Sequence, residues 1–155
     1  MKVLVINPGA TSTKVAVFEE EQELLKKSIV HTAQELEGFD RVIDQADFRQ
    51  RAVLEAVAEG GFRLEDFDAV CGGLYRPIPS GTYAVSDRVM QDVEQAPYGE
   101  HPSNLGAYLA RRIGDLVGIP AFFVDPVCVD EMTEVAHVSG FAEFRRLSQF
   151  HALNQ

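Results

Sequence analysis

Side chains that can hold an anion gather in a short segment near the start of the chain. The segment contains three hydroxyl residues and a lysine: Thr11, Ser12, Thr13 and Lys14. Apolar runs at 3–6 and 15–18 flank it, so we expect a β-hairpin, with Pro8 fixing one φ and Gly9 permitting a left-handed one. Hydroxyls, loop amides and an ammonium group can converge on phosphate. Because polar turns of this composition are common, a solvated hairpin is the alternative.

The segment is not one of the phosphate-binding loops that open a helix. A P-loop reads G-x-x-x-x-G-K-[ST], but no second glycine precedes Lys14, and Val15 follows it. A G-x-G-x-x-G fingerprint at a helix start is also absent from the sequence. Any phosphate bound here would therefore lie in a β-hairpin.

Composition limits the classes of protein to consider. A chain of 155 residues with 46% hydrophobic residues can bury one core, so we expect a single domain spanning 1–155. The net charge of −10 argues against nucleic acid and acidic membrane surfaces as partners. Two cysteines, no signal peptide and no apolar run near the ~20 residues of a membrane span predict a cytoplasmic protein.

The expected secondary structure alternates after an initial group of strands. After the hairpin, the predicted elements are a strand at 23–32, a helix at 40–59, a strand at 68–71, a long excursion at 73–102 with a short helix capped by Ser86, a helix at 102–117, a strand at 119–124 and helical character over 141–155. The order βββ-α-β-α-β predicts an α/β fold with helices on both faces of a mixed sheet. The first strand should lie beside the two later, parallel strands.

Polar residues from separate parts of the chain fall at one edge of this sheet. Ligands in such folds bind beyond the carboxyl ends of the strands. The positions at those ends are Asn7, Gly72-Gly73, Ser103 and Asp125, together with the excursion. Their convergence favours a phosphate site over a plain turn.

Five segments resemble the butyrate kinases, which belong to the acetate kinase family of the actin-like ATPase superfamily, with its ribonuclease H-like domains. They are NPGATSTK (7–14), GGLYRPIPSGTY (72–83), GEHPSNLG (99–106), VDPVCVDEM (124–132) and FHALNQ (150–155). The resemblance runs along the whole chain, but only to the family's N-terminal domain. It implies that a C-terminal domain, which supplies most of the nucleotide pocket, is missing, and that 141–155 begins a helix leading to it.

The resemblance implies transfer of a phosphoryl group from ATP to a short-chain carboxylate, butyrate or a branched-chain acid. The nucleophile is already an anion, so the difficulty is repulsion between two anions, which Mg²⁺ and basic side chains relieve. Lys14 and the hydroxyls of 11–13 would hold phosphate oxygens. Asn7 and Asp125 would orient Mg²⁺ or its waters. Asp125 matches the family's active-site aspartate, although it could simply end a strand before proline.

Other site residues are also expected from the resemblance, each with a structural alternative. His101 and His151 would hydrogen-bond the carboxylate or the phosphoryl group, but a lone histidine is often structural. Arg76 would clamp the substrate carboxylate, or else lie in solvent. An apolar wall for the acyl chain would come from Val70, Tyr83 and Phe150, for which core packing is an equal alternative. We expect His31 and His137 to be surface residues.

Two departures from the family's pattern leave other functions open. Ala10 replaces an expected serine in the phosphate loop, and Cys71 replaces an arginine before the glycine pair. If that arginine normally meets the substrate, the acid-binding site is altered, and a different acid or weaker activity would follow. The main alternative is a non-catalytic half-domain that binds phosphate or a partner protein, and a homodimer is possible. A nuclease of ribonuclease H type is disfavoured, because Asn7 stands where a carboxylate would be needed.

Overall fold

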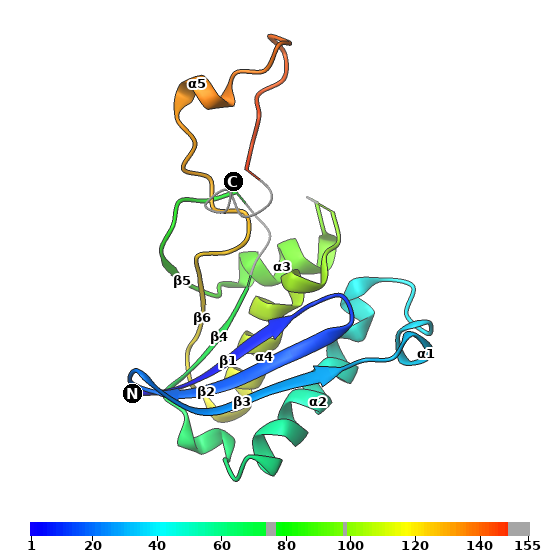
Figure 1. Cartoon of the computed structure of the whole chain (residues 1–155), viewed down its shortest axis with the longest axis vertical. Coiled ribbons are helices and arrows are strands. Elements are labelled where there is room, and N and C mark those ends of the chain that lie inside the picture. The colour runs from blue at the N-terminus through cyan, green and yellow to red at the C-terminus, as the bar shows by residue number, and fades with distance from the viewer. Residues whose placement is uncertain (74–76, 98, 149–155) are drawn as a thin grey trace.

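The computed structural model describes residues 1–73, 77–97 and 99–148 and contains one six-stranded sheet (Figure 1). The strand order is β3-β2-β1-β4-β6-β5. Their bounds are β1 Lys2–Pro8, β2 Ser12–Glu19, β3 Gln22–Val30, β4 Ala69–Gly72, β5 Thr82–Ala84 and β6 Ala121–Val124. The parallel strands β1, β4 and β6 form the centre, and β2, β3 and β5 pair antiparallel to their neighbours. Of the two later parallel strands predicted beside the first strand, β4 pairs with β1, whereas β6 pairs with β4.

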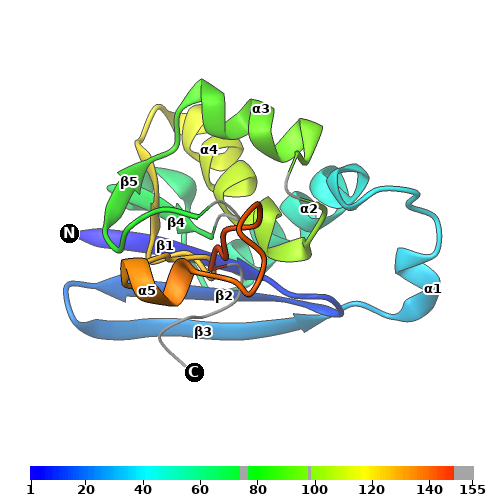
Figure 2. The same cartoon turned by 90° about the horizontal axis from the view of Figure 1, so that it is seen from above.

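The core lies between this sheet and its long helices. Alternate residues of β1 and β2 are buried: Leu4, Ile6, Val15 and Val17. Helices α2 (Ala46–Glu59) and α4 (Leu105–Val117) pack on them, and α3 (Asp87–Gln95) packs on α4 (Figure 2). Each fully buried aliphatic side chain contributes on the order of 2 kcal/mol to folding. The chain thus forms the predicted mixed α/β sheet with helices on both sides, although α2 and α4 share one face.

Glycines bring the end of β4 against the start of α4. A Cβ atom on Gly106 would overlap the backbone nitrogen of Gly73 and lie 3.2 Å from the carbonyl carbon of Gly72. The Ala107 N–H donates to the Gly73 carbonyl at 2.7 Å. A 3-10 turn, Pro102–Asn104, leads directly into α4. Close backbone packing therefore fixes Ser103 at the carboxyl end of the central strands.

Local end signals explain the remaining helices. The Ser86 hydroxyl caps α3 as predicted, accepting the Val89 N–H at 3.4 Å. Gly118 ends α4 with φ of 74°. Thr32 forms a capping box with Glu35 at the short α1 (Ala33–Leu36). The helix predicted at 40–59 is divided into a 3-10 turn, Val42–Gln45, and α2; a further 3-10 turn is Leu64–Asp66.

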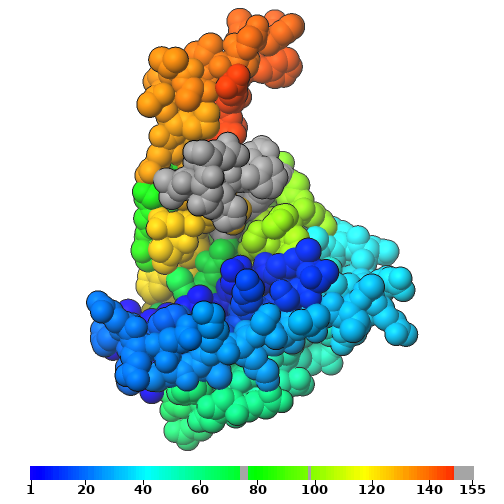
Figure 3. Space-filling model, viewed as in Figure 1, coloured from blue at the N-terminus to red at the C-terminus, as the bar shows by residue number. Residues whose placement is uncertain are grey.

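Two predictions about secondary structure are wrong. The excursion contains an unpredicted strand, β5, and the segment predicted as helix from 141 is not helical over 141–148. Instead, one turn, α5 (Glu134–His137), is followed by a bridge between Val138 and Arg145. Residues 133–148 project from the body of the molecule (Figures 1 and 3). The apolar side chains spaced three residues apart, Phe141, Phe144 and Leu147, are exposed rather than packed on another described element. Because most helix stability comes from packing of an apolar face, their spacing does not produce a helix here. Residues 149–155 lie outside the described part.

Candidate functional site

A cleft of about 280 Å³ opens at the carboxyl ends of the central strands. Its lining comes from β1, β4, β6, the turn before α4 and the segment after β6. The lining residues are Val5, Ile6, Asn7, Cys71, Gly72, Gly73, Ser103, Val124, Asp125, Pro126 and Val127. The structure thus brings together the four polar positions that the sequence placed at the strand ends.

Asp125 adopts a strained backbone at the edge of this cleft. Its φ is 39°, a left-handed value that costs a non-glycine residue on the order of 1 kcal/mol. The carboxylate Oδ1 accepts the Gly81 N–H at 2.7 Å, and the Asp125 N–H donates to the Gly81 carbonyl at 3.1 Å. Asp125 therefore connects the excursion to the end of β6, which supports a structural role for this residue at the strand end. These two contacts do not use Oδ2, which is left for a ligand.

Asn7 and Asp125 offer oxygen atoms of the kind that Mg²⁺ prefers. Mg²⁺ is commonly bound by one or two carboxylates together with substrate phosphates and water. In the described ranges, no group of three or more His, Cys, Asp or Glu side chains could hold a metal ion. A divalent ion in this cleft would need oxygens from its ligand, and the residues present fit Mg²⁺ carried in with a phosphate.

The hairpin between β1 and β2 places Lys14 beside the cleft. Asn7 and Lys14 are directly opposite in the antiparallel register, so both side chains lie on the same face of the sheet. Lys14 is exposed, as are Ala10 and Thr11 in the turn. The turn is closed by the Gly9 N–H, which donates to the Ser12 carbonyl at 2.7 Å. Gly9 does not use the left-handed conformation that a glycine permits, since its φ is not positive.

Thr13 lies on the opposite face, so its hydroxyl is turned away from any ligand in the cleft. The residue is completely buried, and its Oγ1 lies 2.8 Å from His31 Nε2 and accepts from Arg49 Nη1 at 3.0 Å. Strand alternation is the reason, because Thr13 shares the inward face with Val15. The phosphate role predicted for Thr13 is therefore wrong, whereas that of Thr11, Ser12 and Lys14 stays a prediction.

His31 is buried, so the prediction of a surface residue is wrong. It is 3% exposed, and its ring packs edge-on against Phe48 with centroids 5.0 Å apart. Burial, and then the charge of Arg49, lower the pKa of His31. A neutral imidazole fits its position beside the guanidinium, with Thr13 between them.

Arg49 was not identified from the sequence. Its side chain is fully buried under the hairpin, and burial lowers its pKa. The available signal was its position on α2, three residues after Ala46 and four before Val53, both of which are buried. That spacing places residue 49 on the apolar face, where an arginine needs buried acceptors.

His101 does not line the cleft. It precedes the 3-10 turn before α4, where its Nδ1 accepts the Ser103 N–H at 3.2 Å and is hydrogen-bonded to the Ser103 hydroxyl. The ring borders a separate small cavity with Val42 and Leu105. Ser103, which does line the cleft, is thus a hydrogen-bond partner of His101. The role predicted for His101 toward the substrate stays a prediction.

The apolar wall of the cleft differs from the one expected. Val70 is completely buried in the core. Tyr83 stacks on Phe123 with centroids 5.3 Å apart, and its hydroxyl donates to the Pro79 carbonyl at 2.9 Å. Neither lines the cleft. Its apolar surface comes instead from neighbours on the other face of the strands and the segment after β6: Val5, Cys71, Val124, Pro126 and Val127. Burial raises the pKa of the Cys71 thiol, which keeps it protonated.

Three predicted site residues, Arg76, Phe150 and His151, lie outside the described part of the chain. His137 is described and is buried, so its expected surface position is wrong. Its Nδ1 donates to the Arg146 carbonyl at 2.7 Å, within the projecting segment.

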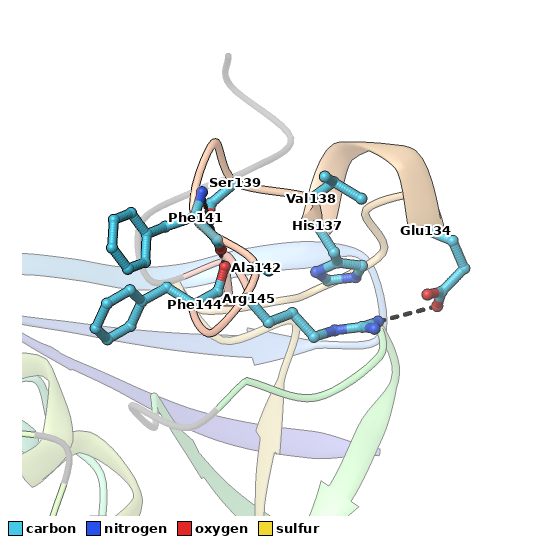
Figure 4. A pocket seen from close by; sticks show the side chains of 8 residues that line it. All are labelled: Glu134, His137, Val138, Ser139, Phe141, Ala142, Phe144 and Arg145. Carbon is cyan, nitrogen blue, oxygen red and sulfur yellow. Dashed lines mark hydrogen bonds and ion pairs between the residues drawn. The ribbon is translucent and has the colours of Figure 1, made fainter.

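That segment has its own pocket, of about 260 Å³, whose described lining shares no residue with the strand-end cleft (Figure 4). Arg145 reaches Glu134 at 3.0 Å across it, and the rings of Phe141 and Phe144 lie side by side, pointing away from His137 (Figure 4). Among the described residues, none that was predicted to act on phosphate lines this pocket. It is therefore not part of the candidate site.

Two solved structures that share this fold are acetate kinases. The chain matches acetate kinase from Porphyromonas gingivalis with a TM-score of 0.58 and 20% identity, over 97% of this chain and 45% of that one. It matches acetate kinase from Entamoeba histolytica with a TM-score of 0.60 and 10% identity, over 99% of this chain and 44% of that one. The fold is thus the actin-like ATPase fold of the acetate kinases.

Sequence comparison identifies a narrower group. No protein-family model matches the chain. It is 43% identical to butyrate kinase 1 of Clostridium acetobutylicum and 45% identical to butyrate kinase 2 of the same organism, each over 156 aligned residues that cover 99% of the chain. The chain is a homologue of the butyrate kinases, and it spans about 44% of the length of these relatives. None of its described helices has the length and apolar character that crossing a membrane requires.

Proposed function

We propose that this chain is part of an acyl kinase that transfers a phosphoryl group from ATP to butyrate or a branched-chain short acid, giving ADP and an acyl phosphate. The observation that carries the proposal is the meeting of Asn7, Gly73 and Asp125 in one strand-end cleft, beside the exposed Lys14. The relatives named butyrate kinases support the choice of acid. ATP, Mg²⁺ and the carboxylate are the ligands proposed.

In this mechanism the chain contributes position and charge. The carboxylate needs no general base, because it is already deprotonated. The ammonium group of Lys14 and the exposed loop of the hairpin would hold phosphate oxygens, and Asn7 and Asp125 would hold Mg²⁺. When bound, Mg²⁺ supplies the charge neutralisation that lets one anion approach another. Val5, Cys71 and Val127 would contact the alkyl chain and exclude water.

A second candidate function is a phosphate-binding or partner-binding domain without turnover. The observation in its favour is that the chain covers less than half of the butyrate kinases that it matches. Two-domain closure often completes a kinase site. We therefore expect weak or no turnover from these 155 residues alone, with activity restored by the part of a relative that they do not match.

Trapping of the acyl phosphate as its hydroxamate tests the proposal. We would assay the chain alone and fused to the unmatched remainder of butyrate kinase 1 of Clostridium acetobutylicum, with butyrate, ATP and Mg²⁺. The fusion should form hydroxamate, and Asp125→Asn should reduce the rate by at least about 100-fold, the usual loss for one electrostatic group. The control Asp115→Asn changes an exposed carboxylate on α4 and should leave the rate of hydroxamate formation unchanged. A folded fusion without product would refute the kinase proposal and leave the non-catalytic one.

A further inference from the structure

The hairpin at the candidate phosphate site is held from beneath by one buried arginine. Arg49 donates from Nη1 to the Ser12 carbonyl at 3.0 Å and from Nη2 to the Ala10 carbonyl at 3.3 Å. Its Nε donates to Gln45 Oε1 at 3.0 Å, which orients the guanidinium from α2. The carbonyl of Thr11, which lies between Ala10 and Ser12, accepts a hydrogen bond from the backbone N–H of His31 at 2.8 Å. All three successive carbonyl oxygens of the turn are therefore occupied by protein donors.

This arrangement determines where the amide groups of the turn point. In a planar trans peptide, the C=O of one residue and the N–H of the next point in opposite directions. Because the Ala10 carbonyl faces Arg49, the Thr11 N–H faces away from it. Within the described ranges, the N–H groups of Ala10 and Thr11 donate to no protein acceptor, and both residues are exposed. Free backbone N–H groups in a tight turn are suited to binding an anion.

The charge of Arg49 favours the same ligand. No carboxylate in the described part of the chain forms an ion pair with it, and its acceptors are all neutral. The neighbouring imidazole of His31 cannot act as a counter-ion either, because its lowered pKa favours the neutral form. A buried cation without a counter-ion is costly, and an anion on the outer side of the turn would offset part of that cost. In the absence of ligand, neutral acceptors stabilise the guanidinium: two backbone carbonyls, the Gln45 amide oxygen and the Thr13 hydroxyl.

We propose that Arg49 is a positioning residue for phosphate: it turns the carbonyls of Ala10 and Ser12 inward, so that the amide of Thr11, next to the exposed amide of Ala10, is presented to a phosphoryl group. The inference rests on the proposed function, because it names the group that shapes the same phosphate site. Arg49 itself does not touch the ligand. Its effect should therefore appear in affinity and in the environment of the turn amides.

The test is a titration of the ¹⁵N-labelled chain with tripolyphosphate, followed by NMR. In the wild type, the amide signals of Ala10 and Thr11 should shift and saturate. Arg49→Met should weaken tripolyphosphate binding by on the order of tenfold or more. This is the loss expected when one hydrogen bond from a turn amide to the charged phosphate is no longer formed. Arg49→Lys keeps the charge but not the planar, multi-donor guanidinium, so its affinity for tripolyphosphate should lie between those of the wild type and Arg49→Met. Arg51→Met, at an exposed position on the same helix, should bind like the wild type.

The outcomes separate this inference from the proposed function. If the amide signals of the turn in the wild type do not shift with tripolyphosphate, both the phosphate site and the role of Arg49 are refuted. Wild-type binding, with an affinity for folded Arg49→Met within about twofold, would refute the inference alone. If Arg49→Met does not fold, Arg49→Lys decides, because unchanged affinity and unchanged turn signals in that variant would equally overturn it.

Discussion

Replacing Gly106 by alanine tests whether close backbone packing builds the strand-end cleft. On propensity alone the change should stabilise α4, by at most about 1 kcal/mol. The structure predicts the opposite sign, because the new methyl group would overlap the Gly73 nitrogen and lie 3.1 Å from its Cα. These are backbone atoms, which cannot rotate away as a side chain can. The end of β4 and the start of α4 must therefore separate.

The size of the effect follows from the contacts that would be strained. Overpacking costs roughly 1–3 kcal/mol, and weakening the bond from Ala107 N–H to the Gly73 carbonyl costs about 1 kcal/mol. After the helix gain is subtracted, Gly106→Ala should lower the free energy of unfolding by roughly 1–3 kcal/mol. In a domain of this size, that corresponds to a fall in Tm of roughly 3–10 °C.

Urea unfolding followed by circular dichroism measures this change. Gly38→Ala is the matched control, because a Cβ there meets nothing within 4 Å and its φ is not positive. The control should unfold within about 0.5 kcal/mol of the wild type. A Gly106→Ala variant as stable as the wild type, or more stable, would refute the close approach of β4 and α4 and with it the described shape of the cleft.

Three further predictions concern His31, Cys71 and the projecting segment. Because burial lowers the pKa of His31 below its unfolded value near 6.5, neutral His31 is favoured in the folded state. Stability should hold above that pH and fall below it, and His31→Gln should flatten this part of the pH profile of urea unfolding. Cys71 should react slowly with iodoacetamide at neutral pH and faster as pH rises, since its thiol pKa is raised; a rate as high as that of a free thiol at neutral pH would contradict this. Phe144→Ser changes a side chain that is 68% exposed, so its Tm should stay within about 2 °C of the wild type; a large fall would mean that the segment packs on the body.

The central strands and α4 were predictable because their signals are local. Continuous apolar runs identified β1, β4 and β6, and Gly118 marked the end of α4. β5 could not be found in this way, because three residues between Gly81 and Val85 carry little pattern and become a strand only by pairing with β6. The spacing of Phe141, Phe144 and Leu147 was equally misleading, since periodicity indicates a helix only where another surface covers its apolar face.

The site was predictable in position but not in the direction of its side chains. Strand ends and their polar residues located the cleft. Whether Thr13 faced the ligand or the core depended on the register of the hairpin, which pairs Pro8 with Thr13 and turns the hydroxyl inward. Val70 takes its core alternative because it lies opposite Leu4 in the parallel register and shares the buried face of the sheet. Arg49 was hidden because an arginine on an amphipathic helix usually lies in solvent, and its acceptors come from a turn 36 to 39 residues earlier.

Mapping where the proposed product binds would show whether the strand-end cleft is the phosphoryl-transfer site. The ¹⁵N-labelled chain would be titrated with butyryl phosphate in the presence of Mg²⁺. We expect the shifted amides to be those of the strand ends and the hairpin, around Asn7, Gly73 and Asp125. Saturating shifts confined to the pocket of residues 134–145, or no shifts in a folded chain at millimolar ligand, would contradict this expectation.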